Sequence, residues 1–332
     1  MKKQIIAAAV AAAFAVPAMA QVTISGSLDI GYDTTSAGNP DRTFSAGTLS
    51  TPDLKLAGSE DLGGGLKAFF DINSGLGGVL GNTGAANATA GSGQAAGEGN
   101  AINFGDRGNR VGLSGGFGTI AIGKTTGSAM NDVRGGVAGN LSLLYAGGFA
   151  VDADRPANSV DYVAPAMKLG GGNLVLRALY QTSSQSYEIS GRFARGPLSL
   201  QMVYQDVKAA TADRTGGDTG LRLGYNLGFA AVNVSMQDIK SGVATAGITR
   251  TDGRYTSYGV TMPMGAVSIF AESQDRPDRR GNKVNAGAVY TLSKRTNTYI
   301  AYSKDDSDAA ASATSSRGAV DPITVVGVRH SF

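Results

Sequence analysis

Residues 118–125 read Gly-Thr-Ile-Ala-Ile-Gly-Lys-Thr and satisfy the G-x-x-x-x-G-K-[ST] pattern of a phosphate-binding loop. Such a loop needs a strand before it, a flexible cradle of backbone N–H groups and a helix after it. Here the four middle residues, Thr-Ile-Ala-Ile, are good strand formers, and no helical period follows Thr125. The segment therefore predicts a strand and not a nucleotide site.

Residues 112–116 read Gly-Leu-Ser-Gly-Gly and match the G-x-S-x-G pattern around the nucleophilic serine of many hydrolases. That chemistry needs a histidine as general base. The chain has one histidine, His330, and we expect it in a C-terminal strand on the lipid-facing side, together with Val328 and Phe332. A tight turn after Ser114 is the better interpretation, and the sequence predicts that the protein is not an enzyme.

Three carboxylates, Asp305, Asp306 and Asp308, could bind Ca²⁺ weakly through oxygen ligands. The fixed spacing and the glycine of a calcium-binding loop are missing, so a solvated acidic loop is favoured. The chain has no cysteine, which excludes both disulfides and thiolate metal sites. We therefore predict no metal and no cofactor.

The first 20 residues have the pattern of a secretory signal peptide. Lys2 and Lys3 precede an apolar stretch at residues 5–16, and Ala18-Met19-Ala20 fits the small-x-small cleavage rule. We expect residues 1–20 to be removed and residues 21–332 to be exported. The formal charge of +3 includes both lysines and falls to +1 without them, which gives no argument for nucleic acid. No later segment approaches 18 consecutive apolar residues, so no transmembrane helix is predicted.

The dominant pattern in residues 21–332 is alternation with period 2. In Val22–Asp33 the even positions are mostly apolar and the odd positions are mostly polar, as a strand between two different environments requires. We predict about 16 such strands. They lie near residues 22–33, 52–60, 65–74, 107–115, 117–124, 158–165, 172–181, 185–195, 197–206, 217–226, 228–238, 255–262, 265–273, 283–292, 296–304 and 322–332.

The connections between these strands alternate between short turns and long polar segments. Short turns are expected at Asp61–Gly65 and Arg195–Gly196, and long segments at Ser74–Asn100 and Lys304–Asp321. This is the loop pattern of outer-membrane barrels, which have tight periplasmic turns and long outer loops. The fold class predicted is all-β, a 16-stranded antiparallel transmembrane β-barrel that is wide enough for an aqueous channel.

Three motifs carry a family resemblance over nearly all of residues 21–332. They are Glu-Asp-Leu-Gly-Gly-Gly-Leu at 60–66, Leu-Ser-Lys-Arg-Thr at 292–296 and Gly-Val-Arg-His-Ser-Phe at 327–332. Together they resemble the Gram-negative general porin family of trimeric 16-stranded porins. The resemblance implies a homotrimer in the bacterial outer membrane, with bilayer lipids and small hydrophilic solutes as partners. It also implies a third outer loop, near Thr125–Asp154, folded into the barrel to narrow the pore.

The resemblance further implies a set of charged residues at this constriction. Asp53 stands where the family usually has Arg, and Asn73 where it usually has Glu, so the family's anion selectivity is not carried over. The predicted loop residues are Asp132, Arg134, Asp152 and Asp154, and the predicted wall residues are Arg107, Arg155, Lys124, Asp53, Asn73 and Lys67.

The phase of two of these residues conflicts with a place in the pore. Arg107 and Lys124 fall in register with the apolar residues of their strands, which would aim them at lipid. A basic residue at the bilayer midplane costs about 2–4 kcal/mol. Either a β-bulge at Gly108 or Gly123 resets the phase, or these residues lie above the lipid band.

Two functions fit this barrel. The first is a water-filled channel for passive diffusion of ions and small hydrophilic solutes, with selectivity set by charged residues at the constriction. The alternative is a barrel that acts mainly in surface binding, as an adhesin or phage receptor, with a plugged lumen. The segment after the fifth strand discriminates between them, because a channel needs it to constrict without occluding.

Overall fold

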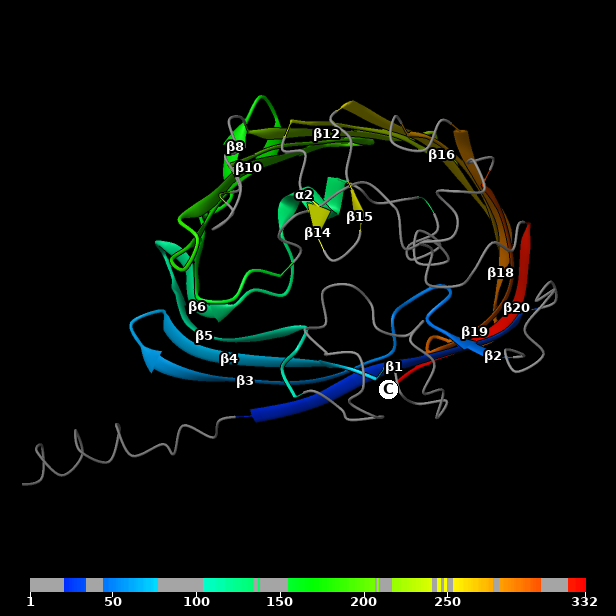
Figure 1. Cartoon of the computed structure of the whole chain (residues 1–332). Helices are drawn as coiled ribbons and strands as arrows, with labels where there is room; N and C mark the ends of the chain where they lie inside the picture. Colours follow the sequence, from blue (N-terminus) through cyan, green and yellow to red (C-terminus); the bar gives the residue numbers. More distant parts are fainter. Residues whose placement is uncertain are drawn as a thin grey trace, which may run out of the picture.

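The structure is a computed structural model in which one β-sheet closes on itself (Figure 1). The described residues are 21–33, 44–76, 104–133, 137, 155–206, 208, 217–240, 244–245, 248–249, 253–276, 281–305 and 322–332. The sheet has 18 strands, of which 16 form the barrel wall and two short ones, β2 and β8, extend it. All neighbours in the wall are antiparallel, so the predicted fold class is confirmed.

The wall strands follow each other around the ring in chain order. They are β1 (Gln21–Asp33), β3 (Asp53–Gly63), β4 (Leu66–Gly75), β5 (Gly108–Gly115), β6 (Gly118–Lys124), β7 (Ser159–Val163), β9 (Gly172–Gln181), β10 (Ser186–Arg195), β11 (Leu198–Asp206), β12 (Asp218–Asn226), β13 (Ala231–Ile239), β16 (Gly253–Met264), β17 (Val267–Arg276), β18 (Gly281–Thr291), β19 (Thr296–Asp305) and β20 (Ile323–Ser331). The short elements are β2 (Phe44–Ala46), α2 (Ala129–Val133), β8 (Met167–Leu169), β14 (Ala244–Thr245) and β15 (Ile248–Thr249).

The ring closes where β1 meets β20. Seven residue pairs, from Ser27 opposite Ser331 to Asp33 opposite Val325, join the two strands. The ladder continues through Gly26 and Phe332, whose backbone groups exchange hydrogen bonds of 3.0 and 3.1 Å. Closure satisfies backbone groups that would each cost several kcal/mol if left unpaired in lipid.

The strand boundaries mostly follow the prediction, with one clear difference at residues 158–165. The strand ends at Val163, and the short strand β8 pairs separately with β9. Pro165 explains the break, because proline has no N–H to donate to a ladder. At the tight turn after β3, Gly63, Gly64 and Gly65 all have positive φ, between 61° and 84°, which glycine adopts without strain.

The two faces of the wall differ in polarity, as predicted. The outward face carries large exposed apolar side chains such as Ile24, Ile189 and Met202. The inward face carries buried polar side chains such as Gln237 and Asn285. This apolar-out, polar-in arrangement is that of a transmembrane barrel. Within the described ranges, no helix has the length and apolarity needed to cross a bilayer.

Apolar clusters interrupt the polar inner face, and two of them include a segment that lies between wall strands. One surrounds Met130 of α2, which lies inside the ring of strands (Figure 1). The other surrounds Leu49, which follows β2. At both places the chain leaves the wall and packs against its inner face, and these two segments shape the lumen.

Candidate functional site on the inner wall

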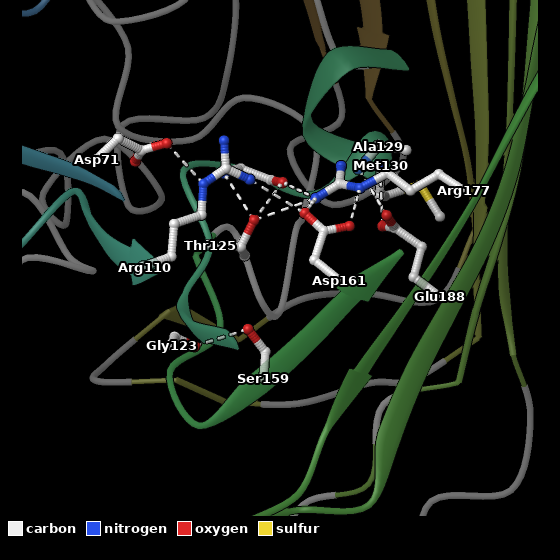
Figure 2. Close-up of polar contacts among 11 residues, drawn as sticks. Asp71, Arg110, Gly123, Thr125, Ala129, Met130, Ser159, Asp161, Arg177 and Glu188 are labelled. Carbon is white, nitrogen blue, oxygen red and sulfur yellow. Dashed lines mark hydrogen bonds and ion pairs between the residues drawn. The ribbon is translucent and has the colours of Figure 1, made fainter. Parts of the chain in front are cut away.

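Four charged side chains form a continuous chain of ion pairs across β4, β5, β7 and β9 (Figure 2). Arg110 Nε lies 2.8 Å from Asp71 Oδ2, and Arg110 Nη1 lies 3.3 Å from Asp161 Oδ2. Arg177 binds both carboxylate oxygens of Asp161, at 2.8 and 2.9 Å. We call Asp71, Arg110, Asp161 and Arg177 the wall relay. Its two arginines and two aspartates sum to zero charge.

The relay spans β6 because that strand has small residues on its inner face. Gly123 lies opposite Arg110 in the ladder, and the next inward residue is Ala121. A Cβ on Gly123 would lie 2.2 Å from the backbone oxygen of Asn109, and its φ of 130° also favours glycine. Arg110 can therefore reach across β6 to Asp161 on the next strand.

The relay also holds the chain that follows β6. Arg177 Nη2 donates to Thr125 Oγ1 at 3.1 Å and to the carbonyl oxygen of Gly127 at 2.8 Å. Next to it, Glu188 of β10 accepts two backbone N–H groups at the start of α2, from Ala129 at 2.7 Å and from Met130 at 3.1 Å (Figure 2). Hydrogen bonds to an ionised carboxylate are stronger than neutral ones, so Glu188 is a firm anchor.

Side chains from further strands bind the carbonyl groups of the same segment. Gln201 of β11 donates to Ala129 O at 3.3 Å, and Gln237 of β13 donates to Met130 O at 2.9 Å. Arg222 of β12 donates to Asp132 O at 3.0 Å. We call residues 125–133 the loop segment. It follows the inner wall from β9 to β13.

Glycine on the wall makes room for the loop segment. A Cβ added to Gly220 would lie 2.7 Å from Val203 Cγ1, 3.0 Å from Met130 Sδ and 3.1 Å from Val133 Cγ1. Farther along, a Cβ on Gly259 would lie 2.4 Å from Val137 Cγ2. These close approaches need residues without side chains on the inner face.

Several inward-facing cations have no carboxylate in an ion pair with them within the described part of the chain. Lys55 of β3 and Arg192 of β10 make no hydrogen bond or ion pair with any described residue. Gln201 of β11 lies between Arg192 on β10 and Arg222 on β12, and the positive charges of the two arginines repel each other. The described part of the inner wall thus combines the neutral wall relay with positive side chains that no described residue neutralises.

Three of the predicted constriction residues come together at the outer end of β3 and β4. Ser27 Oγ donates to Asp53 Oδ1 at 2.8 Å, and Asn73 Nδ2 donates to Asp53 Oδ2 at 3.4 Å. Arg107 lies beside them, since a Cβ on the inward-facing Gly75 would lie 2.4 Å from its Nε. Arg107 precedes β5 in a turn, so it reaches the inner side without a bulge at Gly108.

The other predicted wall residues lie elsewhere. Lys124, the last residue of β6, pairs with Asn109 in an unbroken register and shows no bulge at Gly123. Lys67 lies opposite Asp61, near the turn at the other end of β4. Arg155 is half-buried just before β7, and Asp132 is exposed in α2. Arg134, Asp152, Asp154, Asp306, Asp308 and residues 1–20 lie outside the described residues.

Sequence reasoning missed most of the residues that hold the loop segment. Arg110, Asp161 and Glu188 were not singled out, although each alternates with apolar residues and so belongs to the polar face. The phase of each strand would have identified them. The family comparison pointed instead to Arg107, which lies outside the regular strand.

The motifs that suggested chemistry are parts of the wall. Residues 118–124 form β6, and Ser114 lies in β5 directly before a turn. His330 is exposed on the outer face, where its Nδ1 lies 2.9 Å from Thr296 Oγ1. In the described ranges no three metal-ligating side chains gather. The arrangement lines a passage with fixed charges and hydrogen-bonding groups.

Comparisons with known proteins agree with this architecture. The sequence pattern of the Gram-negative porins matches residues 7–310. The outer membrane porin protein 32 of Delftia acidovorans is 28% identical, with both chains covered in full. Two solved structures share the fold. An anion-selective porin from Comamonas acidovorans has a TM-score of 0.64 at 23% identity, over 94% of this chain and 100% of that one. OmpT of Vibrio cholerae, in a trimer form, has a TM-score of 0.62 at 14% identity, over 94% and 99%.

Proposed function

The chain belongs to the Gram-negative porin family, and from this premise we propose that it is a passive channel whose selectivity is set by charged residues on its inner wall. It is an outer-membrane porin. The path of the loop segment carries the proposal, because its described contacts follow the wall from β9 to β13. A segment held against the wall narrows a pore, whereas a surface-binding barrel with a plugged lumen needs a segment that fills it.

We infer a preference for small anions. Charged side chains that line a pore select ions by their field. Asp71 and Asp161 are each bound by arginine, while Lys55 and Arg192 have no such partner among the described residues. The similar structure from Comamonas acidovorans is named an anion-selective porin, which supports the same preference for anions.

Planar-bilayer recording of the purified protein under a KCl gradient tests both the channel function and the anion preference. Ohmic single-channel steps are expected, with a reversal potential of the sign that chloride preference gives. Arg192→Gln and Lys55→Gln should each shift the reversal potential toward cation preference. Arg254→Gln is the matched control, because Arg254 lies on the outer face opposite Asp238. Folded protein without steps would favour surface binding, and a potential of the opposite sign would refute the anion preference.

We also propose that the mature protein starts at Gln21 and assembles as a homotrimer. The signal-peptide pattern at residues 1–20 supports the first statement, and the trimer form of the OmpT relative supports the second. Intact mass of protein purified from outer membranes tests the start. Conductance steps that appear in groups of three test the trimer.

A further inference from the structure

Three residues on the inner wall are apolar where a water-filled lumen calls for polar groups. Phe270 of β17, Tyr299 of β19 and Val325 of β20 all face inward, and 3% or less of each is exposed. Ala301 extends the same patch. Something must cover them, because apolar surface is stabilised by removal from water.

The cover is the stretch of chain between β2 and β3, residues 47–52, which we call the strap. Leu49 of the strap belongs to the same buried apolar cluster as Phe270, Tyr299 and Val325. Only 8% of Leu49 is exposed. The strap therefore lies inside the barrel against β17 to β20, next to the seam between β1 and β20.

Asp29 of β1 fixes the strap in this place. Its Oδ2 accepts the backbone N–H groups of Leu49 at 2.5 Å and of Ser50 at 2.6 Å. Its Oδ1 accepts the hydroxyl of Tyr299 at 2.6 Å, which ties the carboxylate to β19. Its backbone oxygen accepts Gly47 N–H at 2.9 Å. One wholly buried residue thus makes four contacts, three of them with the strap.

The wall and the strap are shaped to fit each other. Gly31 faces the strap, and a Cβ there would lie 3.2 Å from Thr48 Oγ1 and 2.4 Å from Val325 Cγ1. Gly47 begins the strap with a φ of 84°, which favours glycine. Farther along, the carbonyl oxygen of Pro52 accepts the N–H of Leu76 at 2.9 Å, which fixes the other end of the strap.

We propose that the strap is a second fixed lining of the pore and that Asp29 is its positioning residue. The lumen is then bounded on one side by the loop segment and on another by the strap, so Asp29 helps to set the size of solute that passes. This inference rests on the proposed channel function. It gives the strap, which is part of the first outer loop, a role in setting the width of the pore. It also gives Asp29 an indirect role, because that carboxylate is buried and holds the strap without contacting the solute.

The test compares Asp29→Asn, Tyr299→Phe and Leu49→Ser with the wild type. Asparagine keeps the shape of Asp29, but its one acceptor oxygen is uncharged and its amide nitrogen cannot accept the Tyr299 hydroxyl, so the strap and Tyr299 lose a charged acceptor. Loss of the charged acceptor should raise the detached fraction of the strap by roughly tenfold. Leu49→Ser alters only the strap, so the barrel wall stays intact even if the wall variants fold poorly.

Single-channel recording and exclusion of polyethylene glycols of graded size are the measurements. We expect a second, larger conductance level and a larger polymer cut-off in all three variants, with the smallest change in Tyr299→Phe. Charge alone cannot explain a shared result, because Tyr299→Phe and Leu49→Ser leave the charge unchanged. Asp61→Asn, which removes a carboxylate that binds Gly63 N–H in a turn, is the control without a change in pore size.

The results distinguish a failure of the strap proposal from a failure of the channel proposal. If the wild type gives no conductance, the channel proposal fails. If the wild type conducts and the folded variants show its single level and its polymer cut-off, the strap does not line the passage and Asp29 only stabilises the seam. Band shift on heating in a detergent gel shows that each variant is folded.

Discussion

The loop segment and the strap are both held by a buried carboxylate of the wall, but the two carboxylates use their oxygens differently. Each is fixed by one carboxylate that accepts two consecutive backbone N–H groups, from Ala129 and Met130 at Glu188 and from Leu49 and Ser50 at Asp29. Glu188 uses one oxygen for each N–H group. Asp29 uses a single oxygen for both and keeps the other for Tyr299.

The two segments also differ in how far along the chain their wall partners lie. The strap lies about 20 residues from Asp29, but Tyr299, which binds the same carboxylate, lies 270 residues from Asp29. The strap therefore has its full set of partners only when β1 has paired with β20. The loop segment lies 59 residues from Glu188 and 107 from Gln237. It has its full set of partners only when β9 to β13 are assembled. We expect both segments to be fixed late, the strap only when β1 and β20 close the ring.

The largest effect is expected at the centre of the wall relay. Asp161→Asn leaves Arg110 and Arg177 without their shared anion, and removal of one member of a buried pair costs about 3–5 kcal/mol. Urea unfolding of the barrel in lipid vesicles should show this loss. A double variant, Asp71→Asn with Arg110→Gln, removes both members of one pair and should cost less. An equal or larger loss in the double variant would contradict the account.

A smaller effect is expected at the loop anchor. Glu188→Gln retains one acceptor oxygen, so the loop segment should lose about 1.5–3 kcal/mol of attachment, the contribution of one hydrogen bond to a charged group. Single-channel current should become noisier, with transitions between levels. Glu188→Asp is the control for charge, since it keeps the carboxylate but shortens its reach. A quiet Glu188→Gln channel would show that the strap and the loop segment are not held alike.

Overpacking behind α2 should have a similar or smaller effect. Gly220→Val would force Met130 and Val133 away from the wall, at a cost of about 1–3 kcal/mol. The measured result should be a reduced conductance, because α2 moves into the lumen. Gly191→Ala is the control, since its new Cβ would make an ordinary contact of 3.4 Å with Leu176 on the outer face. Unchanged conductance in Gly220→Val would show that α2 does not border the passage.

The smallest effect is expected from an ion pair outside the lumen. Arg254 Nε lies 2.8 Å from Asp238 Oδ1, the same distance as Arg177 Nε from Asp161 Oδ1, but 64% of the Arg254 side chain is exposed. Water and salt screen such a pair. Asp238→Asn should leave the urea midpoint and the conductance unchanged. A loss comparable with that of Asp161→Asn would mean that burial does not distinguish the two pairs.

Much of the wall could be predicted from alternation alone. Residues such as Asp71 and Arg177 fall in the polar phase of their strands, and the structure places them inside. The strap could not be predicted, because its apolar contact depends on one residue, Leu49, in a stretch with no period. Its partner Phe270 lies between Ile269 and Ala271, so the run is apolar in both phases and does not reveal which residue faces inward.

The site was only partly predictable for a related reason. The convergence of Asp53, Asn73 and Arg107 was suggested by family resemblance, and the register of β3 and β4 brings them together. The attachment of α2 to the wall depends on hydrogen bonds from Gln201 and Gln237, two uncharged residues from strands far along the chain. Neither has a local signal, because amide side chains are common on any wetted strand face.

The neutrality of the wall relay bears on how fast solutes move. An isolated arginine on the wall would hold a passing anion and slow its departure, since a channel must bind weakly enough to release. In the relay each guanidinium already has at least one carboxylate partner on the wall, so a chloride ion would gain little free energy by binding there. In the channel proposed above, Asp71 and Asp161 would therefore shorten the time that each ion spends at the wall, which would favour fast passage over binding.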